Sequence, residues 1–350
     1  EIFYNIIRWK KRLEYYIGEG AKPNNIYRLI LAYLLWSETE YKKFEEFQGI
    51  KVADIITKLK KGTVPTKAFE HSIPDWLVET LEKELGENWE KEMIALNEQA
   101  PTILRANSLK TSTKHLIEEL KHENVESFQV PGFENAVQLE EKKNVFLTSA
   151  FKDGFFEVQD AGSQKIGEFL DVKPGMRVVD ACAGAGGKTL HLAALMENKG
   201  QIIAMDIHGW KLAELKRRAK RAGAHNIETR EITDNKVIKR LHEKADRLLI
   251  DAPCSGLGVL KRNPDSKWKI DQDFIDRIRK EQETILQDYS KIIKKGGKMV
   301  YATCSILPSE NNEQVQNFVK NNSDFKLVKE EKVMPSTGFD GFYMALIERV

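Results

Sequence analysis

Residues 177–189, RVVDACAGAGGKT, contain a short apolar run that leads directly into a glycine-rich loop. Apolar runs of the same kind recur at 201–206, 247–251 and 298–301, with longer segments of helical periodicity between them. Short buried strands that alternate with helices are typical of a mostly parallel sheet with helices on both faces. We therefore predict a doubly wound, Rossmann-like α/β domain over residues 151–350, in which ligands bind at the carboxyl ends of the strands.

The glycine-rich loop does not fit two common nucleotide-binding motifs. A phosphate loop of the Walker type needs Gly six residues before Lys188, where this chain has Cys182. A dinucleotide fingerprint needs Gly or Ala three residues after Gly186, where this chain has Thr189. Asp206 stands at the end of the next apolar run, where a carboxylate can hold ribose hydroxyl groups. These features predict a site for an adenosyl cofactor.

Two cysteines directly follow apolar runs, in the segments 251–258 (DAPCSGLG) and 301–305 (YATCS). A single cysteine is more often a small buried apolar residue than a reactive thiol. Cys254 and Cys304, however, are both followed by serine, and both lie at predicted strand ends near the cofactor loop. We therefore expect both thiols to be chemically active, whereas Cys182 is expected to pack against the cofactor.

The composition is that of an ordinary globular protein. Of 350 residues, 55 are Lys or Arg and 53 are Asp or Glu, a formal net charge of +2 that argues against indiscriminate binding to nucleic acid. Apolar stretches such as 29–36 are too short to cross a membrane, and three widely spaced cysteines form neither a disulfide framework nor a zinc motif. We expect a cytoplasmic monomer without membrane or metal partners. Residue 1 is Glu rather than Met, so the N-terminus is expected to be incomplete.

Two further regions are predicted before residue 151. Residues 1–65 carry apolar residues at helical spacing, with Lys and Arg between them. A packed helical bundle is the simpler interpretation of this region, and a basic face that contacts nucleic acid is the alternative. The sequence of residues 66–150 predicts a small α+β module. Its expected elements are a capped helix entered at 72–76, an extended stretch at 102–107 and a helix at 113–122.

The motifs that contain the cysteines resemble those of the RsmB/NOP/Sun family of RNA cytosine-5 methyltransferases, and the pair of Cys-Ser motifs is highly specific. The family usually has Ala-Pro-Gly-Gly-Lys in its first loop, whereas this chain has Gly-Ala-Gly-Gly-Lys, a difference that alters loop stiffness more than chemistry. The likeness covers roughly residues 72–350. It includes four further segments, 103–110 (ILRANSLK), 158–164 (VQDAGSQ), 262–265 (RNPD) and 339–343 (FDGFY).

This resemblance implies a function for each predicted region. The domain at 151–350 is expected to bind S-adenosylmethionine and to transfer its methyl group to carbon 5 of a cytosine in RNA, most simply ribosomal RNA. The module at 66–150 is expected to bind that RNA. The helical region at 1–65 resembles a NusB-like domain that is cut short.

The chemistry of cytosine explains why cysteines are needed. Carbon 5 is not nucleophilic enough to take a methyl group directly, so a thiolate must first add to carbon 6. By resemblance Cys304 is this nucleophile and Cys254 is needed for elimination and release. The reverse assignment stays open, because Pro-Cys is the nucleophile motif of DNA cytosine-5 methyltransferases.

Polar residues near the cysteines complete the expected site. By resemblance Asp251 binds the cytosine edge or the cofactor, and Lys188 supplies positive charge that favours the thiolate. Asp234 is implied as a cofactor contact, although an isolated Asp after a short strand is commonly a helix cap. The implied cofactor contacts are Cys182, Ala183, Gly184, Ala185, Gly186, Gly187, Lys188, Asp206, Asp234 and Asp251.

RNA contacts are expected to be local. The basic run at 211–221 is read either as a solvated helix face or as part of an RNA surface. Two other function classes compete: a nicotinamide-dependent oxidoreductase, disfavoured by the incomplete fingerprint, and a catalytically silent RNA-binding platform, disfavoured by the two cysteines. The residues expected to contact RNA are Arg105, Lys110, Lys261, Arg262 and Lys267.

Overall fold

The computed structural model describes residues 2–18, 26–42 and 44–350. The chain divides into two compact units, one formed by residues 1–99 with 259–274 and the other by residues 100–258 with 275–350. The first unit therefore contains a segment that the chain supplies between the two cysteine motifs. The predicted divisions at 65 and 150 do not coincide with the limits of these units and stay predictions.

The first unit is helical, as the spacing of its apolar residues predicts. Its helices are α1 (Ile2–Arg8), α2 (Lys10–Ile17), α3 (Ile26–Trp36), η1 (Glu45–Phe47), α4 (Val52–Lys61), α5 (Lys67–Glu70), α6 (Asp75–Leu85), η2 (Gly86–Asn88), α7 (Trp89–Leu96) and α14 (Ser266–Lys269). Leu13 of α2, Leu29 of α3 and Ile55 of α4 share one buried core. The predicted cap of α6 is wrong, because the Ser72 hydroxyl instead accepts the backbone N–H of Lys11 at 3.0 Å.

The second unit begins with a small antiparallel sheet of strand order β2-β3-β1-β4. Leu116 and Leu120 of the helix α8 pack against Leu104 and Val137 of the strands. This α+β arrangement agrees with the module expected around residues 102–122. The elements are β1 (Ile103–Ala106), α8 (Thr113–His122), β2 (Ser127–Gln129), β3 (Ala136–Leu139), η3 (Val145–Leu147), α9 (Ser149–Lys152) and β4 (Phe156–Val158).

The large sheet of the second unit has the strand order β10-β11-β9-β8-β5-β6-β7. Its strands are β5 (Arg177–Asp180), β6 (Gln201–Asp206), β7 (Ile227–Glu231), β8 (Ala245–Asp251), β9 (Ile293–Thr303), β10 (Phe325–Val333) and β11 (Phe342–Arg349). The pairs from β7 through β9 are parallel, and only the pairings of β11 with β9 and β10 are antiparallel. The predicted doubly wound α/β sheet is therefore confirmed, and its order reverses between β5 and β8.

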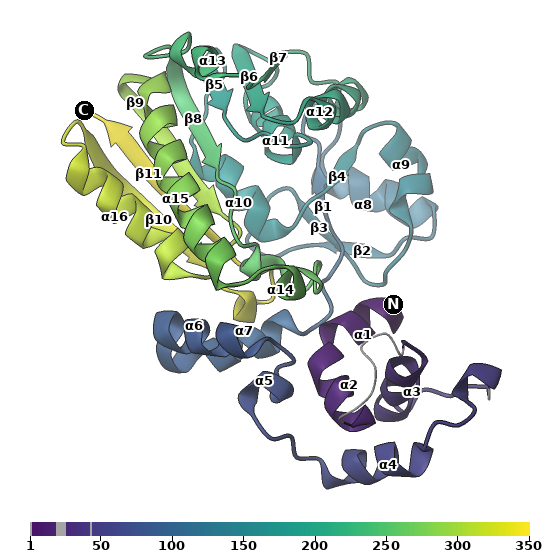
Figure 1. Ribbon diagram of the computed structural model, residues 1–350. Helices are drawn as coiled ribbons and strands as arrows, with labels where there is room; N and C mark the ends of the chain where they lie inside the picture. The colour runs from purple at the N-terminus through teal and green to yellow at the C-terminus, as the bar shows by residue number, and fades with distance from the viewer. Residues whose placement is uncertain (1, 19–25, 43) are drawn as a thin grey trace. The chain divides into compact units, whose positions relative to one another are not determined.

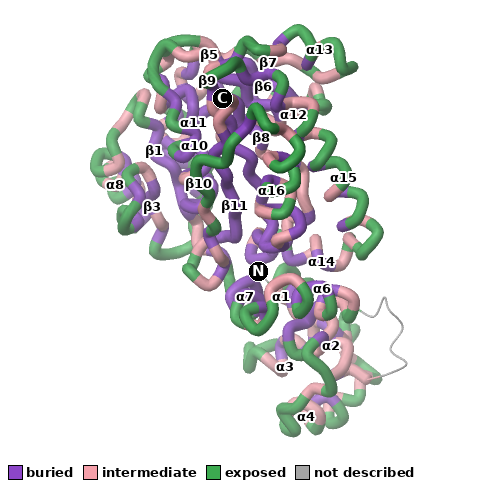
Figure 2. Tube along the Cα trace, turned by 90° about the vertical axis from the view of Figure 1, so that its left-hand side faces the viewer, coloured by how far each residue is buried: buried purple, intermediate pink, exposed green. Residues whose placement is uncertain are grey.

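Helices cover both faces of this sheet (Figure 1). The helices and helical turns between residues 161 and 350, other than α14, are α10 (Ala161–Phe169), α11 (Gly187–Leu195), α12 (Gly209–Ala222), α13 (Asn235–Lys239), η4 (Leu257–Val259), α15 (Gln272–Tyr289), η5 (Ser290–Ile292), η6 (Pro308–Glu310), α16 (Asn312–Asn321) and η7 (Pro335–Thr337). Leu286 of α15 and Val315 of α16 share one core with Leu248 and Tyr301 of the strands. Figure 2 shows the central strands as buried tubes between the helical layers.

The sheet places the predicted motifs at one edge. Because β5, β6, β8 and β9 run parallel, the segments that follow Asp180, Asp206, Asp251 and Thr303 all leave the sheet at the carboxyl ends of its strands. Within the described ranges, no helix is long and apolar enough to span a bilayer.

Candidate active site

The glycine-rich loop connects β5 to α11 and depends on a close approach by α12. Gly186 precedes α11 with φ +88°, a left-handed conformation that favours glycine. A Cβ at this position would lie only 2.5 Å from Cγ of Leu215. The loop is also fastened to β6, since Ala183 donates its N–H to the Met205 carbonyl at 2.8 Å.

Asp206 is held rigidly at the end of β6. Its Oδ2 accepts the backbone N–H of Gly184 at 2.9 Å, and its Oδ1 accepts that of His208 at 2.8 Å. Each carboxylate oxygen can accept a second hydrogen bond. The side chain is therefore fixed in place and keeps acceptor capacity for further donors.

An open cleft of about 290 Å³ lies at these strand ends. Its volume is at the lower end of the range of small-molecule and cofactor sites. Ile207, Ile232 and Ile285 give it apolar walls, while Asp206 and Glu281 contribute carboxylates. The cleft is lined by Ala181, Cys182, Gly184, Asp206, Ile207, His208, Lys211, Ile232, Asp251, Pro253, Glu281, Ile285 and Tyr289.

The other predicted cofactor residues lie elsewhere. Asp234 is exposed, and its carboxylate accepts the N–H of Lys236 at 2.7 Å, which is the helix-cap role that its sequence context allowed. A cofactor contact for Asp234 therefore stays a prediction. Five predicted loop residues are not part of the cleft lining: Ala183, Ala185, Gly186, Gly187 and Lys188.

Lys188 and Asp251 form an ion pair beside the cleft. The Lys188 Nζ lies 2.7 Å from Oδ2 of Asp251, with side chains that are only 14% and 29% exposed. Burial alone would lower the pKa of Lys188, but the charge and hydrogen bond of Asp251, together with Cys304, raise it overall. Lys188 therefore stays protonated despite its burial, and its action on the thiol of Cys304 stays a prediction.

The structure brings the two predicted cysteines together. Cys254 follows β8 and Cys304 follows β9, and their sulfur atoms are 3.3 Å apart. Both residues are half-buried. The hydrogen bond with Cys304, burial and the charge of Glu310 raise the pKa of Cys254 well above its usual value. Cys254 is therefore held as a neutral thiol.

Main-chain bonds join the cysteine loops to each other and to the start of β11. Gly258 donates its N–H to the carbonyl of Cys304 at 2.9 Å, and Gly341 donates to the carbonyl of Gly258 at 2.7 Å. A Cβ on Gly258 would lie 2.3 Å from the Gly341 carbonyl oxygen. Because Gly258 has no side chain, its loop can pack against both the Cys304 loop and the segment of Gly341.

The third cysteine has a different environment. Burial raises the pKa of Cys182 well above its usual value, and the nearby carboxylates of Asp180, Asp251 and Asp206 raise it further. Cys182 borders the cleft as a neutral thiol. This position agrees with the packing role expected from its place in the loop.

Sequence reasoning missed two buried carboxylates, Asp180 and Glu310. Asp180 opens the glycine-rich motif, and its Oδ2 accepts the Thr189 hydroxyl at 2.7 Å. Burial raises the pKa of Asp180 to about 7. The available signal was an acidic residue directly at the end of an apolar run. Glu310 follows the second cysteine motif and carried no such signal.

Most of the expected RNA contacts are wrong. Arg105, Lys261 and Lys267 are buried, so they are not available to RNA. Arg105 donates to the carbonyl of Gly187 at 2.7 Å, and burial lowers its pKa to about 10. Lys110 and Arg262 are not buried, so their contacts with RNA stay predictions.

The basic run on α12 has two parts. Arg218 and Arg221 form ion pairs with the buried carboxylate of Glu157 at 2.9 and 2.5 Å. These two arginines are therefore structural. The basic side chains of this run that remain exposed are Lys216, Arg217 and Lys220, and their contact with RNA stays one of two interpretations.

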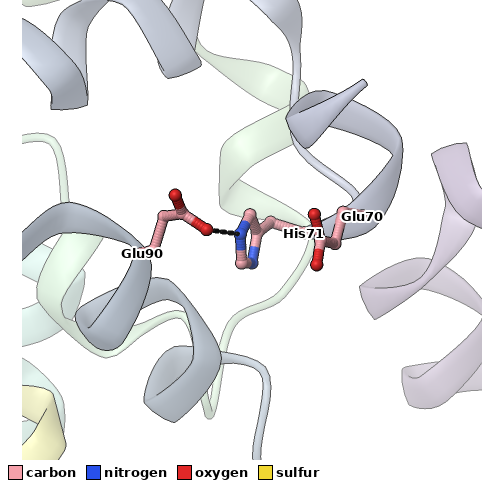
Figure 3. Close-up of side chains that lie close together, drawn as sticks. All are labelled: Glu70, His71 and Glu90. Carbon is pink, nitrogen blue, oxygen red and sulfur yellow. Dashed lines mark hydrogen bonds and ion pairs between the residues drawn. The ribbon is translucent and has the colours of Figure 1, made fainter. Parts of the chain in front are cut away.

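One group of acidic and histidine side chains has the spacing of a metal site among the described residues. It comprises Glu70, His71 and Glu90, and Figure 3 shows Glu90 hydrogen-bonded to the His71 ring at 3.3 Å. The Lys67 ammonium lies 2.7 Å from Glu90 and 3.2 Å from Glu70. This internal cation already balances the carboxylates, so the group carries no metal assignment.

Comparison with known proteins identifies the family. A family model described as 16S rRNA methyltransferase RsmB/F matches residues 168–347. The chain belongs to this RsmB/F methyltransferase family. The resemblance predicted from the cysteine motifs is thereby confirmed. A second model, the ferredoxin-like domain of RsmF/B-like methyltransferases, matches residues 73–146 and includes the small sheet. The NusB-like resemblance of residues 1–65 stays a prediction.

Curated relatives of the RsmB/F family align with most of this chain. A Synechocystis sp. protein named "Probable ribosomal RNA small subunit methyltransferase B" is 36% identical over 82% of this chain and 63% of its own length. The ribosomal RNA small subunit methyltransferase B of Proteus mirabilis is 33% identical over 79% of this chain and 65% of its own length. The chain thus spans a little under two thirds of the length of these relatives.

Solved structures agree with the RsmB/F fold. The protein PH0851 superposes with a TM-score of 0.86 at 26% identity, over 99% of this chain and 89% of its own. A methyltransferase homolog protein from Pyrococcus horikoshii gives a TM-score of 0.72 at 27% identity, over 81% of this chain and 98% of its own. Methyltransferases of the RsmB/F family depend on S-adenosylmethionine, in agreement with the cofactor predicted from the loop and Asp206.

Proposed function

We propose that the chain transfers a methyl group from S-adenosylmethionine to carbon 5 of a cytosine in ribosomal RNA, through a covalent adduct of Cys304 at carbon 6. The observation that carries this proposal is the 3.3 Å separation of two cysteine sulfurs at adjacent strand ends. The names of the curated relatives support ribosomal RNA as the substrate class. The ion pair of Lys188 with Asp251 supplies the charged groups that the reaction needs.

The residues of the cleft fit S-adenosylmethionine. Asp206 would accept hydrogen bonds from the ribose hydroxyls, and Ile207 with Ile232 would contact the adenine. The carboxylates of Asp251 and Glu281 favour a ligand with a positive charge. When bound, S-adenosylmethionine supplies the electrophilic methyl group.

The nucleophile of the proposed reaction is Cys304. Its thiolate adds to carbon 6 of cytosine, and the electrons of the 5,6 double bond become available at carbon 5 for bonding to the methyl group. The Lys188 ammonium favours the thiolate before the addition. Asp251, which accepts a hydrogen bond from Lys188 at 2.7 Å, would hydrogen-bond the edge of the base.

The second cysteine is assigned to product release. After methylation, the proton on carbon 5 must leave so that its bonding electrons restore the double bond and expel Cys304 as a thiolate. Bonding of Cys304 to carbon removes its negative charge, which was one cause of the raised pKa of Cys254. Cys254 can then lose its own proton to solvent and accept the proton from carbon 5.

Single substitutions of the cysteines test this proposal. With RNA and S-adenosylmethionine, Cys304→Ala should form no adduct and no product. Cys254→Ala should still add and methylate but should accumulate a covalent protein–RNA species on a denaturing gel. Cys182→Ala, which changes a thiol outside the pair, should leave turnover possible and should accumulate no adduct.

Two outcomes would overturn the assignment. A shifted band from Cys304→Ala, but not from Cys254→Ala, would exchange the roles of the two cysteines. Full turnover by both variants would remove the covalent mechanism and would favour a structural role with modest effects on stability. Bisulfite sequencing of ribosomal RNA, with and without the active chain, identifies the methylated position.

A further inference from the structure

The two cysteine loops share a short sequence and a local turn. One reads Cys254-Ser255-Gly256-Leu257 and the other Cys304-Ser305-Ile306-Leu307. In each loop the serine hydroxyl accepts the N–H of the leucine two residues later, at 3.4 Å for Ser255 and 3.1 Å for Ser305. Such serine turns fix the backbone next to the cysteine. Both sulfurs are therefore attached to the same kind of anchored loop.

A single carboxylate connects the two turns. Glu310 in η6 is fully buried, and its Oε2 accepts hydrogen bonds from the hydroxyls of both Ser255 and Ser305. Its Oε1 accepts the N–H of Ser255 at 2.8 Å and the side-chain amide of Gln282 at 3.0 Å. Four donors from three different segments therefore converge on the one carboxylate of Glu310.

The segment that carries Glu310 is itself anchored to β9. Tyr301 donates its hydroxyl to the Glu310 carbonyl at 2.8 Å. Asn311 accepts the Thr303 hydroxyl at 2.5 Å and donates its side-chain amide to the Ser305 carbonyl at 2.9 Å. The position of the Glu310 carboxylate is therefore set by residues on both sides of Cys304.

We propose that Glu310 is a positioning residue that fixes both cysteine loops and makes the two sulfurs chemically unequal. The inference rests on the proposed function, because it explains how one site keeps two adjacent thiols in different roles. The hydrogen bonds to Ser255 and Ser305 set the distance between the loops. The buried negative charge opposes a second negative charge on Cys254.

The direction of the Cys254 shift supports this division of roles. Hydrogen bonding to Cys304, burial and the charge of Glu310 all raise the pKa of Cys254. In a buried setting an unscreened charge acts more strongly than it does in water. Glu310 therefore helps to keep Cys254 protonated until Cys304 has reacted.

Alkylation of the full chain by iodoacetamide tests the electrostatic part of the proposal without RNA. Because only the thiolate reacts, the rate at each cysteine, followed by peptide mass spectrometry across a pH series, reports its ionisation. Glu310→Gln should lower the alkylation midpoint of Cys254 by about one pH unit or more. The matched control Glu313→Gln, an exposed glutamate on α16, should leave the midpoint unchanged. Equal midpoints for Glu310→Gln and the unchanged chain would overturn the proposal.

Serine variants test the positioning part and keep the charge of Glu310. Ser255→Ala and Ser305→Ala each remove one bond to the carboxylate, and each should lower the methylation kcat about tenfold. The dissociation constant of S-adenosylmethionine should change less than about twofold, because neither serine lines the cleft. Turnover at the unchanged rate in both variants would overturn the positioning role of Glu310. If Glu310→Gln does not fold, the serine variants alone test the proposal. Absence of cytosine methylation by the unchanged chain would instead refute the proposed function, while the alkylation result would still judge Glu310.

Discussion

At the scale of single residues, Asp206 has the clearest expected effect on the cofactor. Its two oxygens are oriented by the N–H groups of Gly184 and His208. Asp206→Ala should weaken S-adenosylmethionine binding by about 1–3 kcal/mol, because ribose hydroxyls would lose a buried acceptor. Titration calorimetry measures this loss, and Asp54→Ala provides a comparison at an exposed carboxylate on α4, outside the cleft. Unchanged affinity in Asp206→Ala would contradict the site, and preference for a nicotinamide dinucleotide would favour the oxidoreductase.

Asp180 predicts a pH-dependent stability. Burial raises its pKa to about 7, against the usual value of about 3.9 in an unfolded chain. Between these pH values the folded state holds a proton that the unfolded state has lost. The stability that the protonated Asp180 contributes to the fold is therefore fully present below about pH 4 and is lost as pH rises through about 7.

Asp180→Asn removes this titration and keeps an oxygen that can accept the Thr189 hydroxyl. Relative to the unchanged chain, the variant should gain stability between pH 5 and pH 8, by at most about 4 kcal/mol. Urea unfolding at the two pH values measures the difference. Parallel pH curves for the two proteins would show that Asp180 does not titrate in this range.

At the scale of elements, the loop before α11 depends on one glycine. Gly186→Ala forces a left-handed alanine and places a Cβ against Leu215 of α12, which should cost about 2–3 kcal/mol of stability. Gly187→Ala is the matched control, because no atom lies within 4 Å of its Cβ position and its φ is not left-handed. Thermal or urea unfolding compares the two variants. Equal stability would contradict the close packing of the loop on α12.

Strand prediction succeeded where both faces of a strand are buried. The apolar runs at 177–180 and 201–206 coincide with β5 and β6. The edge strand β7 was expected only as a short strand before Asp234, and the edge strand β10 was not predicted, because both carry many charged residues. Their position depends on pairing with neighbours, which local composition does not reveal. β11 is apolar and buried, and the sequence analysis missed it even so.

The candidate site was predictable in its composition but not in its connections. Both cysteines follow parallel strands, so their convergence could be expected from the fold class. The contact of Glu310 with both serines requires tertiary structure. The burial of the basic residues also depends on tertiary structure. Lys267, for example, donates to the carbonyl of Arg8, 259 residues away in the chain.

At the scale of the whole molecule, segment 259–274 belongs to the helical unit although its sequence interrupts the other unit. Lys267 donates to the Arg8 carbonyl at 2.9 Å and to the Asn97 side chain at 3.2 Å. A fragment of residues 100–350 lacks both partners. It should therefore be cut by trypsin after Lys267 about tenfold faster than the full chain.

Mass spectrometry of timed digests measures this difference. Cleavage after Lys239, which is exposed on α13 in the other unit, should proceed at similar rates in fragment and full chain. Equal protection of Lys267 in both would show that the segment does not need residues 1–99 for its structure.

The bonds from Gly341 to Gly258, and from Gly258 to Cys304, have a consequence for biosynthesis. A ribosome makes both cysteine loops before it makes β11, yet β11 pairs with β9 in the finished sheet. A nascent chain that ends soon after Cys304 already contains Cys254 and Cys304 but lacks the backbone group that joins their loops to β11. Under the proposed function, reactivity toward RNA should therefore arise only after β11 has been made, and shorter nascent chains should form no adduct with RNA.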